Sequence, residues 1–420
     1  MSLPPLPAPS RRRRRRLRRF LTLAAVAVLV IGGGTVAVAA LRLSQNVTTV
    51  ELHPARTDEP PVVADFDGAF DVLLVGSDGR AGQGAQYGEG GDVEGSRNDV
   101  TLLLHVNDAH DAATVISFPR DLLVDMPSCT DPETGKTWAA GHRVQFNESL
   151  SRGGLGCVAS TVTALTGIDL AYAAEISFTG VIDASNAVGG VPICFAGPVH
   201  DRHSGLEIPE AGTYDLSGEQ ALALLRSRYG IGDGSDLARI STQQVFLSSL
   251  VRTLRDQSTL TDPVKLYGIA DAATRNMTLS TPLADLGTLA SMAKVFSDLP
   301  LENIAFVSYP HLPAGDRVIP DEQSAAALME RVISGETVSI SSDHTGRGSE
   351  LSASATPPSG DSEGAETTQP ETTQPETTQP ETTGPETTGP DATQPETNTL
   401  PSNVDGQSAA QDTCVRPNAG

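Results

Sequence analysis

The feature that most constrains this chain is an uncharged apolar segment directly behind a block of arginines. Phe20 to Leu41 runs for 22 residues without a charged side chain, and eight arginines lie between Arg11 and Arg19. About 20 apolar residues are enough to cross the hydrocarbon core of a membrane. Because positively charged flanks stay in the cytoplasm, residues 1–19 are predicted to lie inside, and the chain beyond the span outside.

A cleaved signal peptide is the alternative, because the small residues at Ala37 to Ala40 are typical of a cleavage site. The apolar run is longer than the roughly 7–15 residues of a signal-peptide core, which favours a retained anchor. We therefore expect a single-pass protein of the cell membrane, with residues 20–41 as the transmembrane helix and most of the protein outside the cytoplasm.

Charge and cysteine content fit this placement. The 420 residues carry 29 Lys and Arg against 52 Asp and Glu, a net charge of −23, which argues against nucleic acid as a partner. Disulfides persist outside the cytoplasm. Cys129 and Cys157 are the favoured pair because both lie in one loop-to-helix region, with buried free thiols as the alternative. The pairing of Cys194 and Cys414 stays open.

Composition divides the outer part into three segments. Residues 42–68 are polar and contain prolines, which predicts a stalk. Residues 69–338 contain the apolar patterns of a folded domain. Residues 339–420 are rich in Ser and Gly and then repeat the motif ETTQP from Glu366 onward, with almost no large apolar side chains. Such a segment cannot bury enough apolar surface to offset its ordering entropy, so we predict a disordered tail.

The folded domain mixes short apolar strands with helical patterns. Three strands are predicted first, and their nearly continuous apolar runs indicate cover on both faces: Phe70–Val75, Asp99–Val106 and Ala113–Phe118. Helical periodicity follows at 156–166, 217–229 and 236–254, then a strand at 304–309 and a helix at 322–333. Ser217 and Gln220 have the spacing of a capping box. The mixture predicts an α/β fold with helices on both sides of a sheet.

Polar residues cluster where the predicted strands end. The segment Gly76 to Arg80 follows the first strand, and Pro119 to Asp121 follows the third. Ligands of open α/β sheets bind beyond the carboxyl ends of the strands. Arg97 and Asp99 lie at the start of the second strand, so they join this cluster only if that strand runs antiparallel to the others.

The helical patterns add further cations. Arg226 and Arg228 close one predicted helix, and a glycine-rich turn leads into the next. On that next helix Asp236, Arg239 and Gln243 have the spacing i, i+3, i+7 and therefore share one face.

We favour a phosphate or diphosphate site for this cluster. Guanidinium groups match phosphate oxygens, and carboxylates can hold Mg²⁺. Ordinary surface ion pairs are the alternative. The glycine-rich stretch from Gly82 to Gly91 is not followed by a helix pattern, which argues against a nucleotide-binding loop, and we predict a mobile lid instead. His200 and His203 lie in a polar stretch and are interpreted as surface histidines.

The ordered set of motifs resembles the LytR-CpsA-Psr family. The resemblance is strong from about Phe70 to Arg255 and rests on VGSDGR, SRNDVTLLLHVN, ISFPRD, LTGI, FTGVIDASNAVGGV, SGEQALALLRSRYG and DGSDLARISTQQ. It implies an αβα sandwich with a mixed central sheet and an apolar tunnel for a lipid chain. Val158, Val162, Leu165, Val181, Ile182 and Val188 are apolar residues that could line such a tunnel, although a filled core is the simpler interpretation of each.

The resemblance also implies a function. Members of this family are envelope phosphotransferases that move a glycopolymer from a polyprenyl-pyrophosphate carrier onto peptidoglycan. By resemblance Mg²⁺ would be held by Asp78 and Asp99, and the catalytic residues would be Asp78, Arg80, Arg120 and Asp236. The substrate would be bound by Arg97, Asp121, Arg226, Arg228, Arg239 and Gln243. The chain departs from the family at Thr242, where a further Arg is usual, which puts one cationic contact in doubt.

Two other functions remain open from the sequence. One is a polyprenyl-diphosphate phosphatase that uses water in place of a sugar hydroxyl. The other is a non-catalytic module that binds wall or lipid. The sequence does not identify which glycopolymer is carried.

Overall fold

The computed structural model describes residues 41–43, 45–52, 68–77, 96–132, 134–255, 262–340, 345–352 and 404–418. Except for Leu41, the predicted transmembrane segment lies outside these residues, as do the glycine-rich loop and the ETTQP repeats. Among the described residues, none of the helices combines the length and apolar character needed to cross a membrane.

An eight-stranded mixed sheet forms the centre of the domain. Its order is β1 (Thr48–Val50), β14 (Met277–Ser280), β9 (Tyr172–Ile176), β2 (Phe70–Ser77), β3 (Asn98–Val106), β4 (Ala113–Ser117), β15 (Ile304–Ser308) and β19 (Gly406–Ser408). Strand β3 runs antiparallel to both β2 and β4, whereas β2 pairs with β9, and β4 with β15, in parallel. The prediction of a mixed sheet is therefore confirmed, and so are its first three strands.

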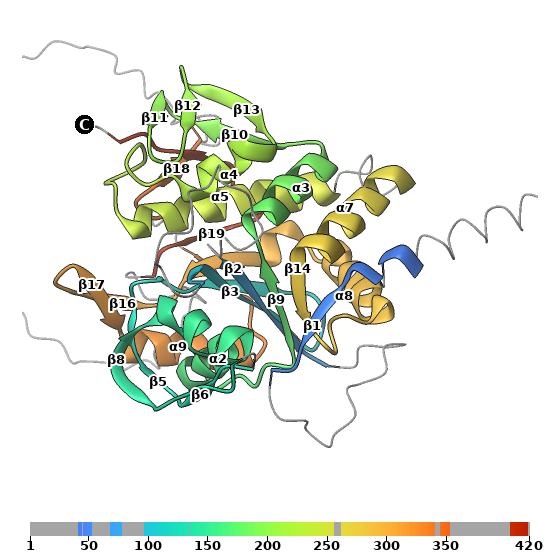
Figure 1. Ribbon diagram of the computed structural model, residues 1–420. Coiled ribbons are helices and arrows are strands. Elements are labelled where there is room, and N and C mark those ends of the chain that lie inside the picture. Colours follow the sequence, from blue (N-terminus) through green and yellow to red (C-terminus); the bar gives the residue numbers. More distant parts are fainter. Residues whose placement is uncertain are drawn as a thin grey trace, which may run out of the picture.

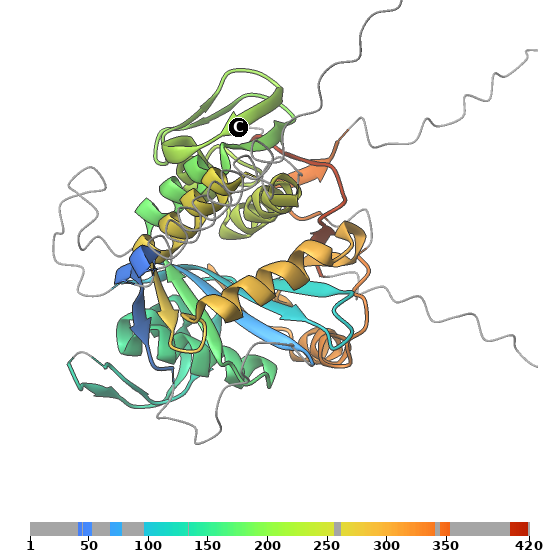
Figure 2. The same cartoon turned by 90° about the vertical axis from the view of Figure 1, so that its right-hand side faces the viewer.

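Helices cover both faces of this sheet, as the nearly continuous apolar strands predicted. On one face α2 (Ser149–Thr166) and α9 (Glu322–Ile333) pack on Leu73 and Val75 of β2. On the other face α5 (Asp236–Arg255) and α8 (Leu286–Asp298) pack near Leu74. Figures 1 and 2 show α2 and α9 below the sheet and α3, α4, α5 and α7 above it.

Three more helices lie above the sheet and partly enclose the space over it. They are α3 (Phe178–Val188), α4 (Gly218–Arg226) and α7 (Pro263–Asn276), and α3 packs between the other two. Helix α4 ends three residues before the predicted end at Tyr229, because Ser227 has an extended backbone with φ −66° and ψ 137°. The Ser217 side chain makes no capping hydrogen bond, so the capping-box prediction is wrong in that detail.

Small hairpins and single turns complete the domain. The paired strands are β5 (Leu123–Met126) with β8 (Gly141–Gln145), β6 (Cys129–Thr130) with β7 (Thr137–Trp138), β11 (Val199–Asp201) with β12 (Leu206–Ile208), and β16 (His311–Ala314) with β17 (Arg317–Pro320). Short 3₁₀ turns η2 (Phe146–Glu148) and η3 (Leu301–Asn303) precede α2 and β15.

A second sheet contains strands from the segment 339–420, so the prediction that this whole segment is disordered is wrong for those strands. Its order is β13 (Gly212–Leu216), β10 (Val191–Phe195), β20 (Thr413–Val415) and β18 (Ser349–Leu351). Strands β18 and β20, like β19 in the central sheet, come from the segment 339–420 that was predicted to be disordered. These strands are only three residues long and lie on either side of the repeats, so they give no clear apolar pattern in the sequence. Strand β20 pairs with β10, whereas β19 pairs with β15 of the central sheet, and Figure 1 shows the dark red C-terminal segment in both places.

Two disulfides connect the domain internally. Cys129 and Cys157 join the β6–β7 hairpin to α2, as predicted, and Cys194 and Cys414 join β10 to β20. The predicted stalk 42–68 was also too long, since Thr48–Val50 pairs with β14 in the central sheet. The folded domain therefore includes residues from both flanking segments.

Candidate functional site

Three strand ends meet at one edge of the central sheet. Because β3 is antiparallel to β2 and β4, its first residues lie beside the last residues of its neighbours, and Ser77 pairs with Asn98. The condition set by the sequence for Asp99 to join the cluster is thus met. Asn98 is fully buried and accepts hydrogen bonds from Ser149 Oγ and the Leu150 main chain, which fixes the start of β3 against α2.

Arg120 lies at the centre of a network of carboxylates. Its Nη1 atom donates to Asp99 Oδ1 at 2.7 Å, and its Nε atom lies 3.3 Å from Asp236 Oδ1. Asp236 in turn contacts Arg239 Nη2 at 2.6 Å, and Arg239 also donates to the main-chain oxygen of Asp99 at 3.1 Å. Residues from β3, from the turn after β4 and from the first turn of α5 are thereby brought together.

This network is partly buried and still has unused hydrogen-bonding capacity. Arg239 is only 5% exposed. Among the described residues, Arg239 Nε and Asp236 Oδ2 are buried and have no hydrogen-bond partner, whereas Arg120 Nε and Asp236 Oδ1 meet only as an ion pair at 3.3 Å. Buried polar atoms without partners are costly unless a ligand or water completes them. The cluster therefore has the character of a binding site and not of a closed structural ion pair.

The electrostatic environment of the two arginines differs. Burial opposes the charge of Arg120, but the carboxylates of Asp236, Asp99 and Asp121 outweigh it and raise the pKa of Arg120. Burial dominates at Arg239 and lowers its pKa, although Asp236 acts in the opposite direction. Both guanidiniums remain charged, because an arginine pKa lies far above neutral pH.

Asp121 is held by residues outside the predicted set. Gln145 Nε2 donates to Asp121 Oδ1 at 3.1 Å, and Arg317 Nη1 lies 3.4 Å from the same oxygen. Arg317 belongs to the β16–β17 hairpin, which docks on the turn after β4 through a bridge between Val318 and Leu122. No motif in the sequence marked Arg317, because its role depends on a hairpin almost 200 residues away from Asp121 in the chain.

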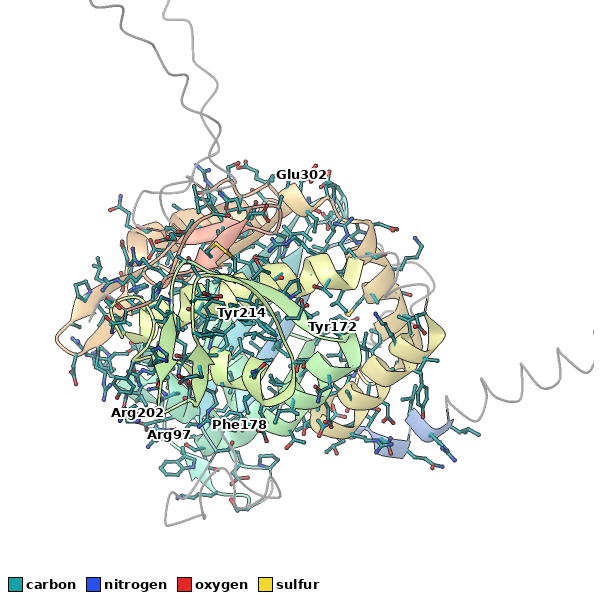
Figure 3. All side chains as sticks on the ribbon, turned by 90° about the horizontal axis from the view of Figure 1, so that it is seen from above. Arg97, Tyr172, Phe178, Arg202, Tyr214 and Glu302 are labelled. Atoms are coloured by element: carbon teal, nitrogen blue, oxygen red, sulfur yellow. A yellow bond between two sulfur atoms is a disulfide. The ribbon has the colours of Figure 1, made fainter. Side chains whose placement is uncertain are left out.

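The end of α4 and the turn that follows it carry the next two arginines, Arg226 and Arg228. The Arg226 guanidinium lies over the Phe178 ring at 4.8 Å from its centroid. Among the described residues, no carboxylate forms an ion pair with Arg226 or Arg228, and Arg228 Nε is buried without a hydrogen-bond partner. Seen from above, Phe178 and Arg97 lie toward one edge of the molecule, and Glu302 lies at the opposite edge (Figure 3).

The C-terminal residues support this turn from outside. The Gly232 main chain donates to Arg416 O at 2.9 Å, and the Asn418 main chain donates to Gly230 O at 3.0 Å. Gly348 packs directly on Ala238 and on Thr242, whose hydroxyl donates to Ala238 O. Thr242 is therefore fully buried under the C-terminal segment, which leaves no room for an arginine side chain at this position.

An apolar cavity of about 270 Å³ leads away from the cluster. It lies between the central sheet and helices α3, α4, α5 and α7, and its polar lining residues are Asp99, Ser185, Arg226, Arg239 and Gln243. Along α5 the lining changes from Arg239 and Gln243 to Phe246, Leu250 and Leu254. At 1.5 Å per residue, Arg239 and Leu254 are separated by about 22 Å, so the cavity is polar beside the cluster and apolar further along the helix.

Two of the residues considered for a tunnel lining occupy this cavity wall. Val181 and Val188 on α3 line it. Val158 and Val162 on α2 belong instead to the filled core on the opposite face of the sheet, and Leu165 packs against that core. Ile182 is not part of the wall. The division follows from which face of the sheet each helix covers, which periodicity alone does not reveal.

The structure describes most of the predicted site residues and places them close to the cluster or the cavity, with three exceptions. Asp78 and Arg80 lie outside the described residues. Arg97 precedes β3 and is exposed. The other predicted residues are near the strand-end cluster, the α4–α5 turn or the cavity wall: Asp99, Arg120, Asp121, Arg226, Arg228, Asp236, Arg239 and Gln243. His200 and His203 are exposed, as predicted.

A magnesium ion fits this site only together with a ligand. The described residues contain no group of three His, Cys, Asp or Glu side chains placed to hold a metal. Asp99 nevertheless presents a carboxylate to the cavity, and its side chain is 25% exposed. Mg²⁺ is commonly held by one or two carboxylates and completed by substrate phosphates and water, so Asp99 suits that arrangement.

Comparison with known proteins identifies related chains. The sequence profile of the LytR-CpsA-Psr family matches residues 39–330. The cell wall biosynthesis protein LcpA of Corynebacterium glutamicum is 32% identical over 267 residues, which are 58% of this chain and 50% of LcpA. The chain thus spans about half the length of that relative. The probable cell wall biosynthesis protein LcpB of the same organism is 30% identical, over 71% of this chain and 68% of LcpB.

Two further comparisons extend the similarity. TagT of Bacillus subtilis, named as a polyisoprenyl-teichoic acid–peptidoglycan teichoic acid transferase, is 27% identical over 68% of this chain and 84% of TagT. Among solved structures, the LytR-Csp2A-Psr enzyme from Actinomyces oris matches with a TM-score of 0.50 and 21% identity, covering 69% of this chain and 96% of the other. At that identity the structural match concerns the fold alone.

Proposed function

The chain belongs to the LytR-CpsA-Psr family, and on that premise we propose that it is a phosphotransferase of cell wall assembly. Its donor would be a glycopolymer on a polyprenyl-pyrophosphate carrier, and its acceptor peptidoglycan. The observation that carries this proposal is the continuity of the cavity: arginines lie at its polar part, and an apolar wall continues along α5. A lipid diphosphate combines the same two properties in one molecule.

The reaction is an in-line displacement at the sugar-linked phosphorus. The oxygen of an acceptor hydroxyl forms a bond to that phosphorus, and the bond from phosphorus to the oxygen of the carrier phosphate breaks. Polyprenyl phosphate leaves, and the glycopolymer becomes attached to the acceptor by a phosphodiester. Positioning and charge stabilisation supply most of the rate in such transfers.

The residues of the site divide these tasks. Arg120 and Arg239, with Arg226 and Arg228, bind and orient the diphosphate and stabilise the charge that develops on it. Asp236 fixes Arg120 and Arg239 through Oδ1, and its Oδ2 atom has no hydrogen-bond partner among the described residues, so Asp236 is our candidate to accept the proton of the acceptor hydroxyl. When bound, Mg²⁺ would neutralise phosphate charge, with Asp99 and Asp78 as its protein ligands.

The location follows from the same proposal. The segment 20–41 would anchor the protein in the cell membrane with its N-terminus inside, which brings the domain to the surface where a lipid carrier resides. Asp78, Arg80 and Arg97 would complete the site from the segment between β2 and β3, and Asp121 would orient Arg120.

Filling the cavity should separate long carriers from short ones. Ala184 lies on α3 and lines the cavity, so Ala184→Phe places a ring where the lipid chain would lie. We expect transfer to peptidoglycan from a long-chain polyprenyl-diphosphate donor to fall by about tenfold or more, a difference of about 1.4 kcal/mol. Transfer from a donor with a short geranyl chain should change little. Radiolabelled glycan bound covalently to peptidoglycan is the measurement.

The matched control is Val264→Phe, which adds the same ring at a site on α7 that is 77% exposed and away from the cavity. Equal losses with both donors would contradict the assignment of the cavity to the lipid. With wild-type protein, release of free glycan phosphate in the presence of peptidoglycan would favour a phosphatase, and binding without turnover a non-catalytic module.

A further inference from the structure

Asp201 is a buried carboxylate that connects two separate segments. It ends β11, and the residue is 2% exposed. Its Oδ1 atom accepts the main-chain N–H groups of His203 and Ser204 at 2.9 and 3.3 Å, which closes the β11–β12 turn. Its Oδ2 atom accepts hydrogen bonds from the α4–α5 turn instead. Oδ1 therefore holds its own hairpin, and Oδ2 holds the turn that follows Arg226 and contains Arg228.

The bonds to Oδ2 fix three consecutive residues. Ser227 Oγ donates at 2.7 Å, and the main-chain N–H groups of Arg228 and Tyr229 donate at 2.9 and 3.1 Å. Helix α4 ends at Arg226, so these N–H groups have no helical acceptor, and Asp201 supplies one. The directions in which Arg226 and Arg228 leave the main chain depend on the conformation held in this way.

The hairpin and the turn are also in close packing contact. A Cβ atom at Gly230 would lie 3.1 Å from Asp201 Cβ and 3.0 Å from Val199 Cγ1. No larger side chain fits between them without displacing one of the two segments. Hydrogen bonds and packing therefore act together to place the turn.

The five hydrogen bonds to the Asp201 carboxylate come from four main-chain N–H groups and one hydroxyl, and none comes from a charged side chain. This separates Asp201 from Asp236, which contacts two guanidiniums. Asp201 thus orders the arginine turn without forming an ion pair with Arg228. The Arg228 Nε atom is buried and has no hydrogen-bond partner among the described residues, so its hydrogen-bonding capacity is kept for a ligand.

From this geometry we propose that Asp201 is a positioning residue of the site, which fixes the main chain of Ser227 to Tyr229 so that Arg226 and Arg228 face the diphosphate. The inference rests on the proposed function, since it concerns the same anionic ligand. It adds a residue from the β11–β12 hairpin, a part of the chain that contributes no side chain to the cavity wall or to the Arg120 network.

Two variants of different severity test this role. Ser227→Ala removes one hydrogen bond to Asp201, and Asp201→Asn replaces an acceptor with an amide that opposes the N–H donors. Geranylgeranyl diphosphate is the probe, and its dissociation constant is measured by titration calorimetry on the full chain. We expect binding to weaken about threefold to tenfold for Ser227→Ala and about tenfold or more for Asp201→Asn, because charged acceptors make the stronger hydrogen bonds.

A double-mutant cycle distinguishes positioning from general destabilisation. In an Arg226→Met/Arg228→Met background, Ser227→Ala should weaken binding by much less than it does alone, because both guanidiniums that the turn orients are absent. The matched control is Glu207→Gln in the same hairpin, whose exposed pair with His200 does not touch the turn. It should bind the probe like the wild type. Thermal unfolding confirms that each variant is folded at the temperature of the titration.

The outcomes are distinct. The inference is overturned if folded Ser227→Ala and Asp201→Asn bind the probe as tightly as the wild type, or if the loss is undiminished in the Arg226→Met/Arg228→Met background. A wild-type chain that binds no diphosphate would remove the proposed function and this inference with it. A wild type that binds, with variants that bind equally well, would remove only the role of Asp201.

Discussion

The site contains two groups of arginines that are held in different ways. Arg120 and Arg239 lie against Asp99 and Asp236, with contacts of 2.6 to 3.3 Å. Arg226 and Arg228 form no ion pair with a described carboxylate, and their turn is placed by main-chain hydrogen bonds to Asp201 and to C-terminal residues. We call the first the paired group and the second the unpaired group.

The difference bears on what each group can do. The positive charge of the paired group is largely balanced before a ligand arrives, so its contribution to binding is small and its fixed geometry matters most. The unpaired group brings charge that has no local counterpart in the described structure and attracts a diphosphate more strongly. We therefore expect the paired group to act on the rate of transfer and the unpaired group on affinity.

The largest expected effect is at Arg120, the centre of the paired group. Arg120→Met removes the guanidinium that connects Asp99, Asp121 and Asp236. We expect kcat for transfer to fall by about 10³-fold or more, the range seen when a charge-stabilising arginine is lost in phosphoryl transfer, with a smaller change in donor KM. Steady-state kinetics with labelled donor and peptidoglycan measure how much of the loss lies in kcat and how much in KM.

The control for Arg120→Met is Arg275→Met, which breaks an exposed ion pair with Asp271 on α7, away from the site. This variant should keep wild-type kinetics. If Arg120→Met raised KM and left kcat unchanged, the proposed difference between the two groups would be wrong, because the paired group would then act on affinity as the unpaired group does.

The second effect concerns Arg226 in the unpaired group. Arg226→Met should weaken binding of geranylgeranyl diphosphate by about 10–100-fold, the equivalent of one hydrogen-bonded charge pair. Once the diphosphate is held, kcat should change little. Because salt screens a partly exposed charge such as that of Arg226, the difference in affinity between wild type and variant should narrow as ionic strength rises. A salt-independent difference would indicate that Arg226 acts through its packing on Phe178 instead.

The paired group is the part of the site that the sequence could predict. Apolar runs located β2, β3 and β4, and the spacing of Asp236 and Arg239 placed them on one helix face, where they are in contact. Only the direction of β3 was missing, and the antiparallel pairing supplied it. Local patterns suffice where the partners lie at strand ends and on one helix.

The support of the unpaired group could not be predicted in the same way. Asp201 ends the short strand β11 in a polar stretch of sequence, and its bonds reach residues 26 to 28 positions further along the chain. Residues 404–418 follow a polar repeat that led to the prediction of a tail. The Cys194–Cys414 pair depends on two strands that are 220 residues apart. In each case the function of these residues depends on main-chain contacts that form only in the folded state. Such contacts place few requirements on residue type, so the sequence does not reveal them.

The smallest effect under working conditions is the response of the unpaired group to acid. Burial opposes ionisation of Asp201, but hydrogen bonds from Ser227 and from the main chain of Arg228, His203 and Ser204 outweigh it and lower its pKa from 3.8 to about 2. A carboxylate with a lowered pKa in the folded state stabilises that state fully above its unfolded pKa. The contribution is lost as pH falls from about 4 to about 2, and it amounts to about 2 kcal/mol.

The free energy of unfolding of wild type and Asp201→Asn, measured by urea titration between pH 2 and pH 7, should therefore differ most at neutral pH, and the difference should shrink by that amount below pH 4. Ser227→Ala removes one of the bonds that lower the pKa, so its unfolding free energy should respond to acid less steeply than that of the wild type. A constant difference between wild type and Asp201→Asn across this range would mean that Asp201 has an ordinary pKa in the folded state. The turn of the unpaired group would then not be held by a charged carboxylate, and the distinction drawn between the two groups would lose its basis.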